Sequence, residues 1–156
     1  AFITRKDFDT DVYKGKLSNL LNERIGVVRG YQNTPEFDLL MDRGEFSIVT
    51  AVNDLNNVEL LINNRVNLII GDPEVIYSEI RRSDKLAQEK QRIMNEIKVI
   101  EPILQMNALF YAVSKRTVHD TQLLVELNKA IDTFLEYGIF DAIKYDVKTN
   151  CQKLNP

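Results

Sequence analysis

Short apolar runs rich in β-branched residues alternate with helical patterns over most of the chain. This alternation constrains the fold more than any other feature of the sequence. An apolar run of this length between turn residues is typical of a buried strand. We predict strands at AFITR (1–5), IGVVRG (25–30), FSIVTAV (46–52), VNLIIG (66–71), IKVIEPIL (97–104) and ALFYAVSK (108–115).

Capping residues mark where the helices between these strands begin. Thr34 and Asp72 each precede a proline, which is the arrangement of an N-cap followed by a first helical residue. A third helix is capped by Asn53 or by the next residue, Asp54. Each helix therefore starts shortly after a strand has ended.

The strongest helical pattern is the segment 119–147, where apolar residues follow the 3.6-residue period. Gly138 interrupts it, and we expect a second, shorter helix after this glycine. The heavily charged segment 83–96 is predicted to be a solvated helix. The periodic apolar residues of the long helix are Leu123, Leu124, Leu127, Ile131, Phe134 and Leu135.

Strands that alternate with helices in this way predict a largely parallel sheet, because parallel neighbours need a crossover connection. The crossover helices then cover both faces of the sheet. The fold class expected from the sequence is therefore α/β, with a mostly parallel sheet and helices on both faces.

Composition excludes several classes of protein. The chain has 156 residues, a net charge of −3 and 44% hydrophobic residues, so it can bury a core but offers no basic face for nucleic acid. No apolar run reaches the roughly 18 residues that cross a bilayer. The single cysteine, Cys151, excludes an internal disulfide. The opening AFITRKDF already has a strand pattern, so we expect the chain to be cut from a longer one.

Open α/β sheets bind ligands beyond the carboxyl ends of their strands, and VVRGYQNTPEF (27–37) follows one such end. Gly30 lets the chain turn close to a ligand, and Arg29 adds positive charge. The helix that begins near Thr34 presents unpaired N–H groups and the positive end of its dipole. The turn can thus hold a carboxylate or a phosphate. An ordinary junction with a capping threonine and a surface arginine is the other interpretation, and it stays open.

The second strand end of interest is LIIGDPEVI (68–76). Asp72 can cap its own helix with one carboxylate oxygen while the other pairs with a ligand ammonium. A simple N-cap is again the alternative. An anion cradle and a carboxylate at the same edge of one sheet match the two charges of an α-amino acid, which favours the binding interpretation.

The other candidate residues give weaker evidence for a binding or catalytic role. His119 is expected to be a surface residue at a helix start, Asp120 a cap, and Cys151 a residue of a polar tail without a motif. The sequence has no dinucleotide glycine pattern, no phosphate-loop lysine and no metal-ligand spacing. We therefore expect no cofactor, no metal site and no catalysis.

The order of these pieces resembles the extracellular solute-binding proteins of family 3, the polar amino-acid receptors of bacterial ABC importers. The similarity covers nearly the whole chain, although each motif alone is only moderately specific. The similar segments are AFITRKD, GKLSNLLNERIGVVRGYQNTPEFD, VNDLNNVELLINNRVNLIIGD, ALFYAVSKRT and LLVELNKAIDTFLEYGIFDAIKYDV.

The resemblance implies a two-lobed clamp that closes on an amino acid or a similar solute. Asp72 would bind the α-amino group. Tyr31 departs from the family's Gly-Thr or Gly-Ser, which leaves the ligand class open because a larger side chain stacks on or blocks a small ligand. The α-carboxylate would be received by Arg29, Gly30, Tyr31 and Gln32, with the helix behind Thr34 assisting.

The family's first lobe has no counterpart in these 156 residues. By resemblance, residues 1–24 are a hinge-crossing strand and a connecting helix, and 25–108 are the second, ligand-binding lobe. Residues 109–156 are a return strand and the C-terminal helices that pack on the missing lobe. The face left exposed on the long C-terminal helix predicts a homodimer.

We therefore expect the solute-binding component of an ABC-type uptake system, located in the periplasm, with a cognate permease as partner. Two alternatives from other classes stay open. One is an extracellular solute-sensing domain of a membrane receptor. The other is a dehydratase-like enzyme on the same fold, for which only Asp72 and Glu74 are placed as acid and base.

Overall fold

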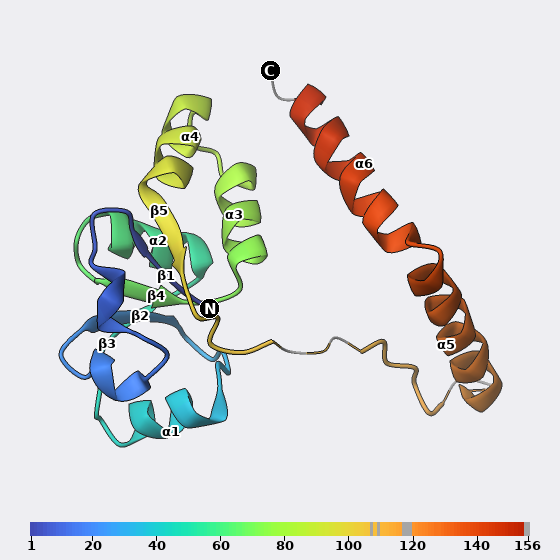
Figure 1. Cartoon of the computed structure of the whole chain (residues 1–156), viewed down its shortest axis with the longest axis horizontal. Helices are drawn as coiled ribbons and strands as arrows, with labels where there is room; N and C mark the ends of the chain where they lie inside the picture. Colours follow the sequence, from blue (N-terminus) through green and yellow to red (C-terminus); the bar gives the residue numbers. More distant parts are fainter. Residues whose placement is uncertain (107, 109, 117–119, 155–156) are drawn as a thin grey trace. The chain divides into compact units, whose positions relative to one another are not determined.

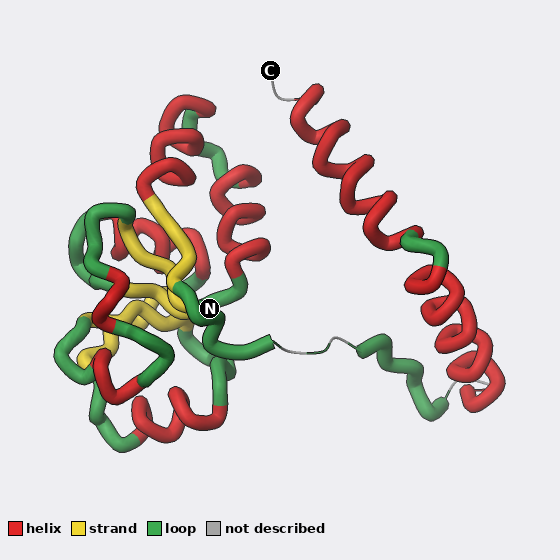
Figure 2. Tube along the Cα trace, viewed as in Figure 1, coloured by secondary structure: helices red, strands yellow, loops and turns green. Residues whose placement is uncertain are grey.

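The computed structural model describes residues 1–106, 108, 110–116 and 120–154. It divides into two compact units, unit 1 from Ala1 to Asn107 and unit 2 from Ala108 to Pro156. Figure 2 shows that the strands all belong to unit 1, whereas the described part of unit 2 consists of helices and loops.

The elements follow the predicted order closely. The strands predicted at 1–5, 25–30, 46–52, 66–71 and 97–104 are all present, with shorter bounds. The strands are β1 (Phe2–Arg5), β2 (Arg24–Val28), β3 (Ser47–Ala51), β4 (Leu68–Ile70) and β5 (Ile97–Ile100). The helices are α1 (Pro35–Asp42), α2 (Asp54–Ile62), α3 (Pro73–Arg82), α4 (Ala87–Glu96), α5 (Asp120–Glu136) and α6 (Ile139–Leu154), with the 3-10 turns η1 (Thr10–Val12) and η2 (Leu17–Leu20).

One predicted strand is missing, because the described residues of 108–115 belong to no strand. A strand is stable only where a neighbour takes up its backbone hydrogen bonds. No described strand pairs with this segment, so its apolar character alone does not make it a strand. The boundaries expected at residues 24/25 and 108/109 stay a prediction.

Within unit 1 the strands form one sheet in the order β3-β2-β4-β1-β5 (Figure 1). β2 runs parallel to both β3 and β4, whereas β1 runs antiparallel to β4 and β5. β5 therefore points the same way as β4. The sheet is mostly parallel, as the alternation of strands and helices predicted, with the first strand inserted in reverse.

Each face of the sheet carries its own hydrophobic core, because side chains alternate between the faces along a strand. In β1, Phe2 points into one core and Ile3 into the other. The first core packs under η1, η2 and α1, where the fully buried Phe37 of α1 contacts the ring of Phe2 at 5.9 Å between centroids. The second core packs under α2, α3 and α4 and includes Val58, Ile76 and Ile93. Helices on both faces confirm the predicted fold class.

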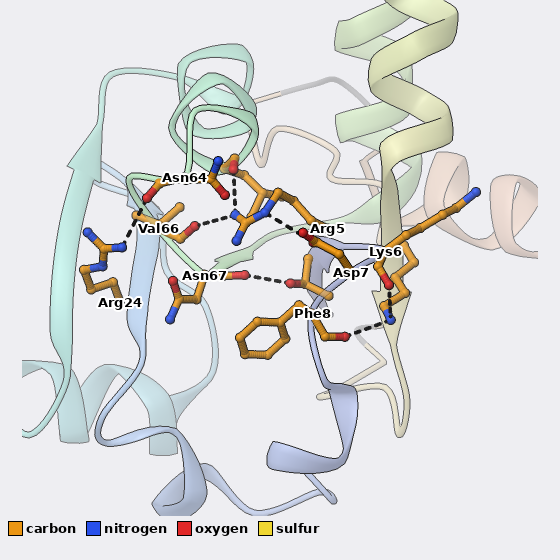
Figure 3. A network of polar contacts seen from close by, with 11 residues as sticks. Arg5, Lys6, Asp7, Phe8, Arg24, Asn64, Val66 and Asn67 are labelled. Carbon is orange, nitrogen blue, oxygen red and sulfur yellow. Dashed lines mark hydrogen bonds and ion pairs between the residues drawn. The ribbon is translucent and has the colours of Figure 1, made fainter.

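A polar network holds the edge of the sheet where α2 ends and β4 begins (Figure 3). The Nη1 atom of Arg5 donates hydrogen bonds to the carbonyl oxygens of Leu61, at 2.8 Å, and of Val66, at 2.9 Å. On the outside of the same turn, Arg24 Nη2 donates to the Asn64 carbonyl oxygen at 3.1 Å. Arg5 thus links the last turn of α2, through Leu61, to the segment that enters β4, through Val66.

In unit 2, α5 and α6 form a helical pair joined at Gly138, whose φ of +64° ends α5 as the sequence predicted. The rings of Phe134 and Phe140 meet edge to face across this bend, 5.7 Å apart. Many apolar side chains of α5 remain exposed, among them Leu123, Leu124 and Leu135. α6 has 16 residues against 17 in α5, so the second helix is not the short one that the sequence predicted.

Candidate functional site

Three parallel strands end side by side at one edge of the sheet, which we call the strand-end edge. Because β3, β2 and β4 are adjacent and point the same way, their last residues Ala51, Val28 and Ile70 lie along this edge. A helix begins soon after each strand, α2 after β3, α1 after β2 and α3 after β4. The edge therefore collects three helix N-termini, each with unpaired N–H groups and partial positive charge.

Side chains cap all three of these helices. Thr34 Oγ1 accepts a hydrogen bond from the Phe37 amide at 3.2 Å, and Thr34 is itself buried. Asn53 Oδ1 accepts from the Asn56 amide at 2.8 Å, so Asn53, and not Asp54, caps α2. The capping roles predicted for Thr34 and Asp72 are confirmed.

The turn after β2 contains most of the predicted anion-binding residues. Arg29, Gly30, Tyr31 and Gln32 are all exposed, and Gly30 has φ +79° with open space where a Cβ would lie. Only glycine takes this conformation without strain. Arg29, Gly30 and Tyr31 line one open hollow together with Asn33 and residues of β3, whereas Gln32, Thr34 and Asp72 are not among its lining residues.

Asp72 lies on the turn after β4, exposed to solvent. Its Oδ1 atom accepts hydrogen bonds from the amides of Glu74, at 2.8 Å, and Val75, at 3.4 Å. Both capping bonds use this one oxygen, and Oδ2 takes part in neither. The geometry therefore allows the two roles expected of Asp72: one oxygen caps α3, and the other is left to bind a ligand ammonium.

The structure adds a residue that sequence reasoning considered only as a cap. Asp54 is the first residue of α2, and its exposed fraction is only 6%. Its Oδ2 accepts a hydrogen bond from the Tyr31 hydroxyl at 3.0 Å, which joins the turn after β2 to the turn after β3. This hydrogen bond, together with the negative charge of Asp54, raises the pKa of Tyr31. The sequence feature that pointed to Asp54 was an acidic residue three positions after the end of β3.

Three further sequence candidates lie where the structure gives no description of their side chains. His119 lies outside the described residues, and so do the side chains of Asp120 and Cys151. Among the described residues, no group of three or more His, Cys, Asp or Glu side chains is arranged to hold a metal ion. No helix in the described part of the chain is both long and apolar enough to span a membrane.

Solved structures share this fold at low sequence identity. An ancestral arginine-binding protein bound to arginine is 19% identical, with a TM-score of 0.63, and the match covers 92% of this chain and 57% of that one. An amino acid ABC transporter substrate-binding protein from Streptococcus pneumoniae bound to L-arginine is 18% identical, with a TM-score of 0.55 and coverages of 91% and 53%. The ancestral protein bound to glutamine matches at 20% identity, with a TM-score of 0.60 and coverages of 92% and 56%.

The chain thus spans little more than half the length of these structural relatives. No protein-family model and no curated protein matches the sequence. At these identities the likeness concerns the fold. The chain has the α/β fold of a lobe-sized part of the arginine-binding and other amino-acid-binding proteins.

Proposed function

We propose that this chain is the ligand-binding lobe of a solute-binding protein that takes up an amino acid, with no catalytic role. The observation that carries the proposal is the strand-end edge, where three helix N-termini and two carboxylates gather at one side of a parallel sheet. Ligands of open α/β sheets bind at such an edge. The structural relatives bind arginine or glutamine.

The anion side of the proposed site is the turn after β2. The exposed Arg29 supplies a full positive charge, and the N-terminus of α1 behind Thr34 supplies backbone donors. Gly30 leaves its surroundings free of side chain, so a carboxylate can approach the backbone closely. Tyr31 and Gln32 complete the turn; the Tyr31 hydroxyl donates to Asp54, and the exposed amide of Gln32 offers a further donor.

The cation side is Asp72. Its Oδ2 is not used in capping α3, and a carboxylate oxygen in this position suits an α-ammonium through a charge-assisted hydrogen bond. Because β2 and β4 are neighbours, the two sides of the site face the same end of the sheet. An α-amino acid carries the matching pair of charges.

A lobe of this kind binds its solute together with a second lobe, and we place the chain in an extracytoplasmic receptor that delivers solute to an ABC permease. The coverage of little more than half of the relatives supports this arrangement. A single lobe makes only part of the contacts and leaves the ligand in water, so we expect weak binding by the chain alone. The exposed apolar side chains of α5 support the association of two copies of the chain.

Titration calorimetry with a panel of L-amino acids on the complete protein tests the proposal. Asp72→Asn keeps a good N-cap residue and removes the charge, whereas Asp72→Ala removes both. We expect both variants to bind about ten-fold or more weakly, since a hydrogen bond to a charged group is worth about 1.5–3 kcal/mol. Amino acid amides, which lack the carboxylate, should also bind weakly.

Asp84→Asn is the matched control, because Asp84 is an exposed carboxylate beyond the far end of α3. It should bind as the wild type does. Equal affinities for wild type and both Asp72 variants would remove Asp72 from the site. Absence of binding by every amino acid in the panel would contradict the proposed function as a whole.

A further inference from the structure

Asp54 is a buried carboxylate in the middle of the strand-end edge. It is 94% buried by its exposed fraction of 6%, and it does not cap α2, since Asn53 already does. A Cβ placed on Gly71 would lie 3.8 Å from Asp54 Oδ1, so this oxygen faces the end of β4. The side chain therefore lies where the turns after β2, β3 and β4 converge.

The carboxylate of Asp54 has no cationic partner within the described part of the chain. None of the ion pairs there involves Asp54. Its Oδ2 accepts from the Tyr31 hydroxyl; Oδ1 has no donor among the described residues, and it is not among their buried atoms without a partner, so solvent reaches this oxygen. A buried charge is costly unless it is paired and hydrogen bonded. The N-terminus of α2 and the solvent at Oδ1 offset part of this cost, but neither supplies a paired positive charge.

Tyr31 covers this carboxylate from the solvent side. Tyr31 as a residue is 53% exposed and lies on the glycine-containing turn after β2, so little packing holds its side chain in place. The hydroxyl is a neutral donor that occupies an acceptor site suited to a stronger, charged donor. Glu79 of α3 also acts on Tyr31 electrostatically, so the surroundings of the hydroxyl favour positive charge.

We propose that Asp54 binds the cationic group of the solute's side chain, an ammonium or a guanidinium, which replaces the Tyr31 hydroxyl at the carboxylate. The inference rests on the proposed function and names the substrate class of that site, amino acids with a basic side chain. Asp72 then binds the α-ammonium of the solute, and Asp54 binds the positive charge on its side chain. Tyr31 acts as the residue that the ligand displaces.

L-arginine and L-citrulline provide the test, because citrulline has nearly the same shape and no side-chain charge. Calorimetry on the complete protein should show tighter binding of arginine. In Asp54→Asn, which keeps an acceptor for Tyr31, the ratio of the two affinities should fall about ten-fold or more, with citrulline binding unchanged. Tyr31→Phe keeps the ring and removes the competing hydroxyl, so arginine should bind about two- to ten-fold tighter. Asp84→Asn should leave both affinities unchanged.

The outcomes separate the two proposals. Binding of both amino acids with an affinity ratio that Asp54→Asn does not alter would overturn the role of Asp54 and leave the proposed function standing. Binding of neither amino acid by the wild type would overturn both. Equal losses for arginine and citrulline would make Asp54 a structural residue only. If Asp54→Asn does not fold, Tyr31→Phe decides, and an effect that is the same for both amino acids overturns the inference.

Discussion

Replacing Arg5 by methionine should destabilise unit 1 much more than the same replacement at Arg24. Both side chains donate to carbonyl groups around the end of α2, and both variants lose one positive charge and keep an apolar stem (Figure 3). They differ in burial, since the Arg5 side chain is only 17% exposed whereas Arg24 is exposed. The pair therefore compares a buried arginine, which makes two hydrogen bonds and an ion pair with Asp7 at 3.5 Å, with an exposed arginine that makes one hydrogen bond.

The magnitude follows from the two bonds of Arg5. A hydrogen bond to a charged group contributes about 1.5–3 kcal/mol, and sharing one nitrogen between the Leu61 and Val66 carbonyls weakens each bond, so we expect about 2–4 kcal/mol in total. Loss of the exposed Arg24 bond should cost about 0.5 kcal/mol or less. For a unit of this size the Arg5 change should lower Tm by at least about 8 °C.

Urea unfolding followed by near-ultraviolet circular dichroism measures this difference in unit 1. The signal comes from packed aromatic rings, and Phe2 contacts both Tyr13 and Phe37 in the first core. Free energies of unfolding that agree within about 0.5 kcal/mol for the two variants would refute the reasoning, because the buried contacts of Arg5 would then contribute no more than the exposed bond of Arg24.

Two further predictions concern Tyr31 and α5. The pKa of Tyr31 is raised from 10.0 because its hydroxyl donates to the charged Asp54, so the folded state favours the protonated phenol. The free energy that this hydrogen bond adds to folding is fully present below pH 10.0. It is lost as the pH rises through the raised pKa. Ultraviolet titration should show one tyrosine midpoint returning toward 10.0 in Asp54→Asn, and an unchanged curve would contradict the assigned hydrogen bond. The exposed apolar residues of α5 predict self-association of the 156-residue chain, which sedimentation velocity measures. A monodisperse monomer at high concentration would contradict it.

The sequence predicted where the helices at the strand-end edge begin, apart from the choice of cap for α2. Thr34 and Asp72 cap α1 and α3 as predicted, because capping depends on a side chain and the amides two or three residues further on. The choice between Asn53 and Asp54 could not be made in this way, since both residue types cap well. In the structure Asn53 accepts from the Asn56 amide, while the Asp54 carboxylate accepts from Tyr31, which is 23 positions away.

The missing strand at 108–115 illustrates a different limit. Its apolar and β-branched residues match a strand pattern, but a strand also needs a neighbour for its backbone groups. Whether such a neighbour exists is a property of the sheet and not of the segment. For β1 the neighbours are β4 and β5, which come more than 60 residues later in the chain.

The sequence alone predicted the order of elements, the α/β class and most of the caps. It could do so because apolar periodicity, proline and capping side chains act over a few residues. The strand order, the reversed β1 and the burial of Asp54 depended on which distant segments meet. These features arise from packing between elements, where a carboxylate after one strand finds a hydroxyl after another. The candidate site is therefore half local, in Thr34 and Asp72, and half a product of the assembled sheet, in Tyr31 and Asp54.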